Sequence, residues 1–498
     1  MATTATPFKM SRIGRHGLIY GGGIVVSKAV AFLMLPIYTR YLTPADYGIL
    51  QLLEMVIDVV SIFAGSRLGE GIFWFYHKAE TEADRRKVLS TALLVLVTCY
   101  AAATTLLFAF APAVATATLG GAQDVGLVRI AGASFLFESL LVVPFAYLRL
   151  HDKSVLYVGV TTAKLLTQVT LKIIFLVVMG LGARGVLLST LAGNVLVGAG
   201  LTLYLVKDIG LRFSNRAARD LLRFGLPFVG TQVATFILTF GDRFFLRRVT
   251  DLSSVGLYGL AYQFGFLLAV CAEVPFSMVW EPARFAIAKR EDRDEVYARA
   301  FIYFNVVLMT IAVCIALFVG DLLRVMAAPA FLPARDLVPV ILIAYVLQSW
   351  TMMHNVGIQV RERTEFLTLA TWAGAIVALA GYAVLVPRWF GLGAALATVA
   401  SFAVREGAVY AISQRLWPVK YRWGPVLRIV VLAVIVGVAG VVLPRSNIWS
   451  SLALRLVLLA AYFVGVWNCG ILSTSDRLTL KRLVRSRVGA LVALNQRS

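Results

Sequence analysis

Long blocks of apolar residues, each about 20 residues in length, recur from one end of this chain to the other. A helix of that length crosses a hydrocarbon core of about 30 Å. Of the 498 residues, 60% are hydrophobic and 15% are charged, whereas a soluble domain has about 25% charged residues. Backbone polar groups inside a bilayer must bond within their own segment, so blocks of this kind form helices. The sequence therefore predicts an all-α, polytopic membrane protein.

The blocks predict about fourteen transmembrane helices. Residues 1–14 form a short basic lead, and the block after them is too long for the apolar region of a cleavable signal peptide, so we interpret it as the first span. The expected limits are 16–41, 47–66, 88–112, 125–147, 154–180, 184–206, 220–242, 254–278, 297–319, 336–357, 366–387, 390–412, 425–444 and 451–472.

The positive charges predict an orientation in the membrane. The net charge is +21, but the Lys and Arg residues lie between the apolar blocks, which argues against a nucleic-acid-binding domain. Alternate connections are strongly basic, and this asymmetry places them in the cytoplasm with both termini, as in a bacterial inner-membrane protein. The basic connections include stretches within 78–87, 212–223, 289–299, 361–363 and 420–422.

The two halves of the sequence are similar to each other. Tyr47-Gly48 opens an apolar span that leads to a charged loop with Asp84. Tyr258-Gly259 and Asp292 repeat this order, at offsets of 211 and 208 residues. Transporters often consist of repeated halves with the substrate site between them.

This pattern predicts four parts of the chain. We expect an N-lobe of spans 1–6 at residues 1–206 and a C-lobe of spans 7–12 at 207–412. Spans 13 and 14 follow at 413–475. Residues 476–498 form a basic amphipathic tail, which is interpreted as a helix lying on anionic lipid or as a disordered basic segment.

Two stretches carry a resemblance to a known family. The first contains Gly21-Gly22-Gly23, Ser27-Lys28 and the block from Leu35 to Gly48, which reads Leu-Pro-Ile-Tyr-Thr-Arg-Tyr-Leu-Thr-Pro-Ala-Asp-Tyr-Gly. It resembles the opening of the polysaccharide transporter (O-antigen flippase) family of the multidrug/oligosaccharidyl-lipid/polysaccharide exporter superfamily. The second stretch, from Gly225-Leu226-Pro227 to Tyr258-Gly259, is similar to that family's seventh and eighth spans.

The resemblance implies two six-helix lobes around a central cavity, in a protein that works by alternating access. The implied cargo is a polyprenyl-diphosphate-linked oligosaccharide. Spans 13 and 14 would be an addition to the twelve-helix core.

Lys28 is the deepest cation in the predicted spans. An ionised group at a helix centre costs about 2.5–3.5 kcal/mol, so it should face a cavity or a partner. Lys28 lies about eleven residues from either end of its span, or roughly 16 Å, which is too far for its side chain to reach the interface. It either lines a cavity or pairs with an acidic side chain.

The fifth span carries a polar stripe. Thr161, Lys164, Gln168 and Lys172 are spaced so that they share an arc of about 80° on a helix. Such a stripe favours an aqueous path for an anion, although pairing across helices, or Lys172 reaching the interface, would also explain it. The expected substrate-binding cations are Lys28, Lys164 and Lys172, which suit a diphosphate as point charges.

Acidic residues within the spans are candidates for ion coupling or for pairing. Glu54 and Asp58 are four residues apart, so either a cation such as Lys28 lies between them or one acid is protonated. Protons and sodium are the candidate coupling ions. The full set of candidate acids is Glu54, Asp58, Glu138, Asp242 and Glu273.

The sequence lacks the usual signatures of an enzyme. The four cysteines form no CxxC motif, the four histidines share no metal-ligand spacing, and no nucleophile–base set or nucleotide-binding motif is present. We therefore expect no cofactor, no metal and no catalytic residue. Energy would come from an ion gradient, the membrane potential or consumption of the product.

These observations predict a flippase that moves lipid-linked oligosaccharide units to the outer leaflet for O-antigen, capsule or exopolysaccharide assembly. Its partners would be the lipid-linked cargo, membrane lipids and a polysaccharide polymerase or export machinery. The alternatives are a multidrug exporter for organic cations or a peptidoglycan-precursor flippase. A membrane polymerase or ligase is a remote alternative, because the connections on the non-basic side are nearly all under about 15 residues.

Overall fold

The computed structural model describes residues 34–65, 68–121, 124–442 and 448–470, and within these ranges every regular element is a helix. The all-α prediction is confirmed. The elements are α2 Leu35–Tyr41, α3 Pro44–Ala64, α4 Leu68–Lys78, α5 Glu82–Ala109, α6 Ala111–Thr118, α7 Val125–Leu150, α8 Ser154–Lys172, η2 Ile173–Val178, α9 Gly182–Ile209, α10 Asn215–Gly225, α11 Phe228–Val249, α12 Leu252–Leu268, η3 Ala269–Glu273, α13 Val274–Ile287, α14 Arg293–Met326, η4 Pro329–Asp336, α15 Val338–His354, α16 Val356–Val360, α17 Glu365–Leu416, α18 Trp423–Val442 and α19 Ile448–Asn468.

Ten of the described helices are long and apolar enough to cross a membrane, or up to twelve if each of two bent pairs counts as one span. The chain is therefore a multi-pass membrane protein. α17 has 52 residues, and its backbone leaves helical geometry at Phe390, where φ is 47°. It thus contains the predicted spans 366–387 and 390–412. The predicted first span lies mostly outside the described residues, so the total of fourteen stays a prediction.

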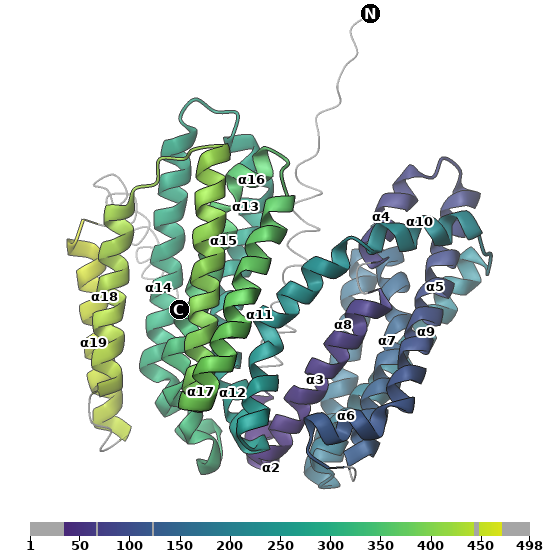
Figure 1. Ribbon diagram of the computed structural model, residues 1–498, viewed down its shortest axis with the longest axis horizontal. Helices are drawn as coiled ribbons and strands as arrows, with labels where there is room; N and C mark the ends of the chain where they lie inside the picture. Colours follow the sequence, from purple (N-terminus) through teal and green to yellow (C-terminus); the bar gives the residue numbers. More distant parts are fainter. Residues whose placement is uncertain (1–33, 66–67, 122–123, 443–447, 471–498) are drawn as a thin grey trace, which may run out of the picture.

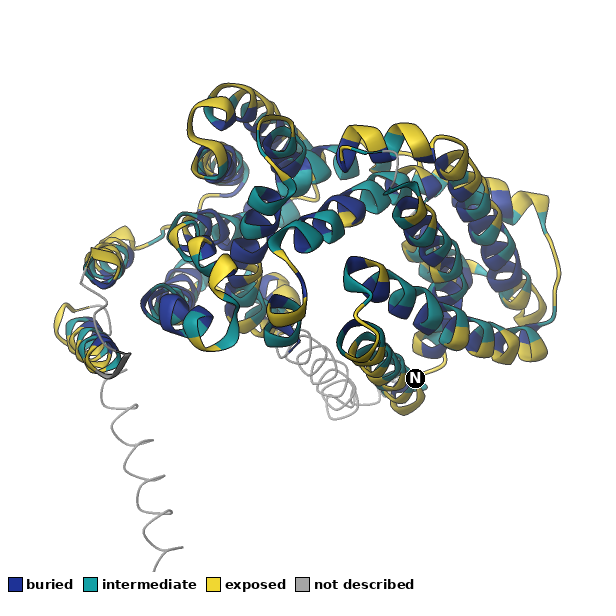
Figure 2. Ribbon diagram, turned by 90° about the horizontal axis from the view of Figure 1, so that it is seen from below, coloured by how far each residue is buried: buried dark blue, intermediate teal, exposed yellow. Residues whose placement is uncertain are grey.

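The helices gather into two groups that diverge toward one end of the molecule (Figure 1). α3 to α9 form one group and α11 to α17 the other, with α18 and α19 beyond the second group. α4, α10, α13 and α16 lie at the divergent end, which carries the basic connections, and α2 and the start of α12 lie at the opposite end. Seen from that opposite end, each group buries its inner helix faces and exposes its outer ones (Figure 2).

Local sequence fixes where α3 begins. The Thr43 side chain accepts a hydrogen bond from the Asp46 N–H, and the Asp46 carboxylate accepts one from the Thr43 N–H at 3.0 Å. This reciprocal cap satisfies two backbone donors, and Pro44 suits the first helical position. α3 ends at Gly65, whose φ of 93° favours glycine. The stretch that carries the family resemblance is thus also a helix-start signal.

α3 and α12 cross at a point where only glycine fits. A Cβ atom on Gly48 would lie 2.0 Å from the Leu252 carbonyl oxygen, and one on Gly256 would lie 1.9 Å from the Pro44 carbonyl oxygen. The two contacts are reciprocal, and their positions differ by 208 residues. Gly48 of the first half therefore corresponds to Gly256 of the second half. This agrees with the 208-residue offset between the charged loops. It does not agree with the 211-residue offset between Tyr47-Gly48 and Tyr258-Gly259.

Further contacts join the two groups at the same end. The Thr39 hydroxyl lies 3.2 Å from the Met326 carbonyl oxygen, and the Arg40 guanidinium donates to the Val325 carbonyl at 3.2 Å. Arg247 at the end of α11 donates to the Thr118 and Leu119 carbonyl oxygens after α6, at 3.0 and 3.1 Å. Carbonyl groups at a helix end lack partners within the helix, so a guanidinium is a favourable cap.

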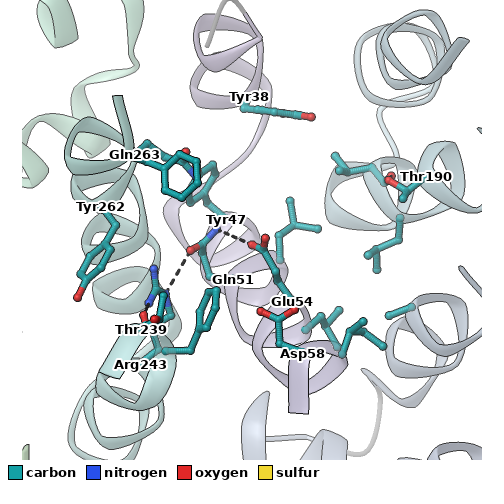
Figure 3. Close-up of a pocket in the computed structure, with 18 of the residues that line it drawn as sticks. Tyr38, Tyr47, Gln51, Glu54, Asp58, Thr190, Thr239, Arg243, Tyr262 and Gln263 are labelled. Carbon is teal, nitrogen blue, oxygen red and sulfur yellow. Dashed lines mark hydrogen bonds between the residues drawn. The ribbon is translucent and has the colours of Figure 1, made fainter. Parts of the chain in front are cut away.

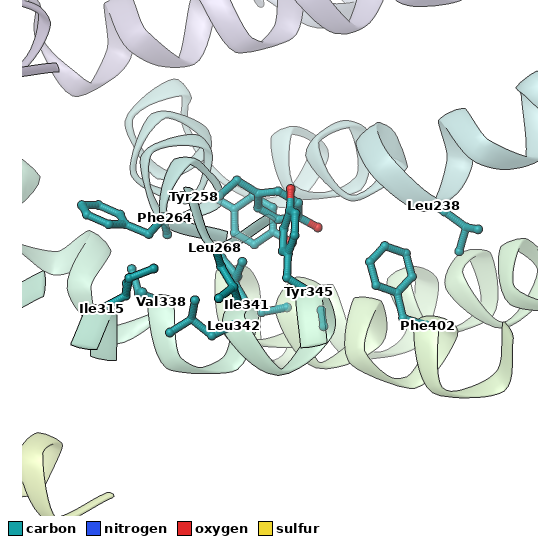
Figure 4. Packing of buried hydrophobic residues seen from close by; sticks show 14 of the residues in the cluster. Leu238, Tyr258, Phe264, Leu268, Ile315, Val338, Ile341, Leu342, Tyr345 and Phe402 are labelled. Carbon is teal, nitrogen blue, oxygen red and sulfur yellow. The ribbon is translucent and has the colours of Figure 1, made fainter. Parts of the chain in front are cut away.

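The second group has a dense apolar core beside this crossing. Leu268 of α12, Ile341 of α15 and Phe402 of α17 are among its buried members (Figure 4). Full burial of an aliphatic or aromatic side chain is worth about 1.5–3 kcal/mol where water is the reference solvent. Inside a bilayer the comparable gain comes from close packing of side chains. The core packs the helices of the second group together on one side of the space between the groups.

α18 and α19 are attached to the second group through polar contacts. Arg455 of α19 pairs with Asp321 of α14, and both side chains are almost fully buried. The Tyr462 hydroxyl of α19 lies 3.5 Å from the Thr310 hydroxyl of α14. Charged groups within a membrane are retained when they find partners of this kind. The predicted tail at 476–498 lies outside the described residues.

Candidate transport cavity

A cavity of about 970 Å³ lies between the two groups of helices. Most of its lining comes from α2, from α3, α7 and α9 of the first group, and from α11, α12 and α15 of the second. Tyr47, Gln51, Glu54 and Asp58 of α3 line it at helical spacing, so one face of this helix is exposed to the cavity along roughly 16 Å (Figure 3). The interface between two repeated halves is where transporters commonly bind their substrates.

Arg243 of α11 is the cation that projects into this space from the second group. Its Nε donates to the Gln51 Oε1 at 3.3 Å, and the Gln51 amide reaches Glu54 at 3.5 Å, so a polar chain crosses from one group to the other (Figure 3). The guanidinium carbon lies 4.5 Å from the Tyr262 ring centroid and 5.1 Å from that of Phe240. Aromatic faces stabilise a cation at such distances.

Asp242 is paired with Arg243 and lies behind the residues that line the cavity. Its carboxylate accepts from the Arg243 guanidinium at 3.1 Å, and its other oxygen accepts from the Tyr258 hydroxyl at 2.7 Å. The Asp242 side chain is fully buried and does not line the cavity. A buried carboxylate is tolerable when it is paired and hydrogen-bonded in this way. Asp242 thus fixes the position of Arg243.

Among the described residues, the three carboxylates in the lining belong to the first group of helices. Asp58 interacts electrostatically with Glu54, with Glu138 of α7 and with Arg243. Glu138 in turn interacts with Lys164 of α8. Carboxylates that lie close together repel one another, so the nearby cations stabilise this acidic wall of Glu54, Asp58 and Glu138. Arg243, linked through Gln51, is a cation beside the Glu54–Asp58 pair.

A second cation lies near the end at which the groups meet. Lys172 ends α8 and lines the cavity, with its ammonium nitrogen 5.8 Å from the Tyr38 ring centroid. The π-helical segment η2 begins one residue later, and a second one, η3, places Val270 and Cys271 in the lining. Widened turns of this type often occur at functional sites, where they re-aim side chains.

Apolar side chains such as Leu50, Ile57 and Phe266 make up much of the remaining lining, and neutral polar groups lie among them. The neutral polar groups include hydroxyl groups of Ser134, Thr190, Thr239 and Tyr262 and the amides of Asn194 and Gln263. Such groups both donate and accept hydrogen bonds, so they match a ligand that is rich in hydroxyl groups.

The structure brings together some of the predicted site residues and separates others. Lys172, Glu54, Asp58 and Glu138 line one cavity, whereas Lys164 interacts with Glu138 without lining it. Lys28 lies outside the described residues.

Two of the candidate acids lie away from the lining. Asp242 is buried behind Arg243, and Glu273 accepts a hydrogen bond from the Ser349 hydroxyl at 3.2 Å. Arg243 was not predicted as a site residue, although Asp242-Arg243 is a charged pair near the end of an apolar span.

Similarity to solved structures supports the fold. A lipid II flippase, MurJ, in an inward closed conformation has a TM-score of 0.73 at 12% identity, over 90% of this chain and 98% of that chain. An inward-facing multidrug resistance transporter of the MATE family and MOP superfamily has a TM-score of 0.64 at 16% identity, over 78% and 94%. An outward-facing MATE transporter gives 0.52 at 16% identity, over 80% and 94%. A comparison with curated proteins finds no match.

Two groups of membrane helices around a cavity with charged and polar residues in its lining give a multi-pass membrane protein whose fold is similar to that of these structures. Residues 37–334 match the family described as polysaccharide biosynthesis protein. The chain belongs to this family, and the resemblance noted in its N-terminal stretch is confirmed.

Proposed function

We propose that this protein is a flippase that moves a polyprenyl-diphosphate-linked oligosaccharide from the cytoplasmic to the outer leaflet. The observation that carries the proposal is Arg243, a cation that is bonded to Gln51 and Asp242 and lines a cavity between two groups of membrane helices. Membership in a polysaccharide biosynthesis family supports the class of cargo.

The chemistry of such a cargo sets the task. A diphosphate and a glycan lose many hydrogen bonds with water in hydrocarbon, which costs several kcal/mol for each unsatisfied group. The polyprenyl chain stays in lipid on both sides. The protein therefore needs only to shelter the head group, and no bond is made or broken.

The charges in the cavity suit the two parts of the head group. Arg243 and Lys172 would hold the diphosphate, because cations form strong charge-assisted hydrogen bonds with phosphate oxygens. Glu54, Asp58 and Glu138 would accept hydrogen bonds from sugar hydroxyl groups or amino groups. Lys28 and Lys164 are proposed to add positive charge to the same path.

The present arrangement corresponds to one state of an alternating-access cycle. The groups meet at the α3–α12 crossing and diverge toward the basic end (Figure 1). With the basic end in the cytoplasm of a bacterial inner-membrane protein, as the charge asymmetry predicts, this state opens inward. The opposite state requires the Gly48–Gly256 crossing to separate. Glu54, Asp58 and Glu138 are the proposed acids for coupling this change to protons or sodium.

Two other cargoes have specific support. The acidic wall of Glu54, Asp58 and Glu138 favours an organic cation, as in a multidrug exporter. Similarity in fold to a lipid II flippase favours a peptidoglycan precursor, which would use the same cations.

Mass spectrometry of lipid-linked saccharides after removal of the gene separates these cargoes. The proposal expects a polyprenyl-diphosphate oligosaccharide to accumulate and cell-surface polysaccharide to fall. Accumulation of a peptidoglycan precursor would select that cargo instead. Unchanged lipid-linked saccharides with increased sensitivity to organic cations would reject the flippase function.

A further inference from the structure

The helix that joins the two groups, α10, has an unusual distribution of side chains. Ala218 and Leu221 form its buried stripe, which packs on α4 and α5. Arg216, Arg219 and Arg223 follow one another at spacings of three and four residues, so they form a second stripe. All three arginines are exposed, and the one acidic residue of α10, Asp220, leaves it with a net positive charge.

Exposed apolar residues lie between these two stripes. Leu222 is 46% exposed, and Leu226, directly after the helix, is 73% exposed. On a helix with 3.6 residues per turn, both project between the buried stripe and the arginines. A helix with cations beside exposed leucines fits the boundary between lipid head groups and hydrocarbon.

Beside these leucines is a hollow of about 80 Å³, whose lining is apolar except for Gln232. Leu222 and Leu226 form one wall, Ile62 and Phe63 of α3 and Cys99 of α5 form others, and Val229 of α11 closes it. The hollow and the transport cavity have no lining residue in common within the described part of the chain. Its walls come from both groups of helices, at the 42° bend between α10 and α11.

We propose that α10 and this hollow form a binding site for an anionic phospholipid of the inner leaflet. The arginine stripe binds the phosphate and the charged head group, and the hollow takes a short length of one acyl chain. Charge complementarity selects an anionic over a zwitterionic lipid, since cations near an anionic leaflet each contribute about 1 kcal/mol. Leucines at the membrane boundary disfavour a soluble acidic partner, because they would be left in water.

This site would favour the present arrangement of the helices. α3 and α5 lie on one side of the hollow and α11 on the other, so a chain between them contacts both groups at the end where they diverge. A ligand that binds one arrangement better than the other shifts the equilibrium toward it. Binding at α10 requires no cargo, so the inference is independent of the proposed transport function.

Native mass spectrometry of the delipidated full-length protein tests the site, with dioleoylphosphatidylglycerol and dioleoylphosphatidylcholine as probes. The wild type should bind the first more tightly. Arg216→Gln, Arg219→Gln and Arg223→Gln together should weaken that binding on the order of a hundredfold. Lysine at the same three positions should retain most of it, which separates loss of charge from misfolding.

A matched control removes three exposed cations elsewhere at the basic end: Lys289→Gln, Arg415→Gln and Lys420→Gln. Equal weakening by this control would overturn the proposal, because it would show attraction to a diffuse positive surface. Equal affinity of the wild type for the two lipids would overturn it as well. So would a polyprenyl phosphate that displaces phosphatidylglycerol at lower concentration, because the surface would then be a docking site for cargo.

Cys99→Phe tests the hollow, because the larger side chain fills it. It should weaken binding of dioleoylphosphatidylglycerol and leave binding of the dihexanoyl form unchanged. The same affinity for the dioleoyl form in this variant and in the wild type would remove the hollow from the site.

Discussion

Arg243 and Asp242 are so deeply buried that loss of either one acts on both folding and cargo binding. Truncating one member of a buried pair leaves the other charge uncompensated, at a cost of about 3–5 kcal/mol. Arg243→Ala should therefore lower the abundance of the protein whether or not Arg243 binds cargo. A variant that removes both charges separates the two roles.

We expect the double variant Asp242→Asn with Arg243→Gln to restore abundance without restoring transport. Neutral amides leave no uncompensated buried charge, but the positive charge for the diphosphate is gone. Immunoblotting of membranes measures abundance, and the amount of surface polysaccharide measures transport. Asp321→Asn with Arg455→Gln is the matched control, because that pair lies away from the cavity and should retain transport. Full transport by the first double variant would make Arg243 a structural residue.

Part of this site could be predicted from the sequence, because charged side chains are energetically costly inside a membrane. Depth and helical spacing selected Lys172, Glu54, Asp58 and Glu138, all of which line the cavity. The same argument could not select Arg243, because its role depends on contacts with α3, which precedes it by almost 200 residues in the chain. Glu273 shows the converse case, since an acid in a span can also be satisfied by a neighbouring serine.

The crossing of α3 and α12 closes the end of the molecule that lies opposite the basic connections. Gly256→Leu should prevent this closure, because even its Cβ would lie 1.9 Å from the Pro44 carbonyl oxygen. The expected result is a shift to a state that opens at this end, with loss of transport. Labelling of the native residue Cys271 can detect this opening, because its side chain is exposed in the cavity. With the other three cysteines replaced by serine, Cys271 should become reactive toward an impermeant maleimide added outside cells.

Gly200→Leu is the control for this measurement. Gly200 is exposed on α9, and a Cβ there would meet nothing within 4 Å, so Cys271 should stay as protected as in the unsubstituted protein. Protection of Cys271 in Gly256→Leu as well would show that the crossing is not the outer gate.

Apolar length predicted most of the individual helices. The structure adds the local causes of some of their ends: Thr43 and Gly65 act through short-range hydrogen bonding and backbone freedom, and Pro387 precedes the break at Phe390 in α17. The π-helical segments η2 and η3 were not predicted. Their extra residue per turn reflects packing against other helices, which no local pattern encodes.

At the scale of the whole molecule, the placement of the basic end in the cytoplasm can be tested directly. Cysteine introduced at Asn215, the first residue of α10, should be protected from an impermeant maleimide in intact cells. Cysteine at Ser446, between the last two predicted spans, should react. This pattern follows from the positive-inside rule. The reverse pattern would invert the topology and make the present state outward-facing.

The two-lobed arrangement was expected from the family resemblance, whereas the closed end and the shape of the cavity were not. Both depend on contacts between helices far apart in the chain, such as Arg40 with Val325 and Arg247 with Thr118. In lipid, these contacts depend on close packing and on the pairing of polar groups, and apolar patterning says little about either. The sequence offered one clue to them, the 208-residue offset of the charged loops.

Movement of cargo by the purified protein tests the central claim most directly. The full-length protein is reconstituted in liposomes with a polyprenyl-diphosphate oligosaccharide whose sugar is fluorescently labelled, and an impermeant reductant measures the fraction that reaches the outer leaflet. A flippase should move this cargo as the wild type, and should move little of it as Asp242→Asn with Arg243→Gln at equal protein content. Flipping at the rate of protein-free liposomes, together with transport of an organic cation such as ethidium, would contradict the proposed function.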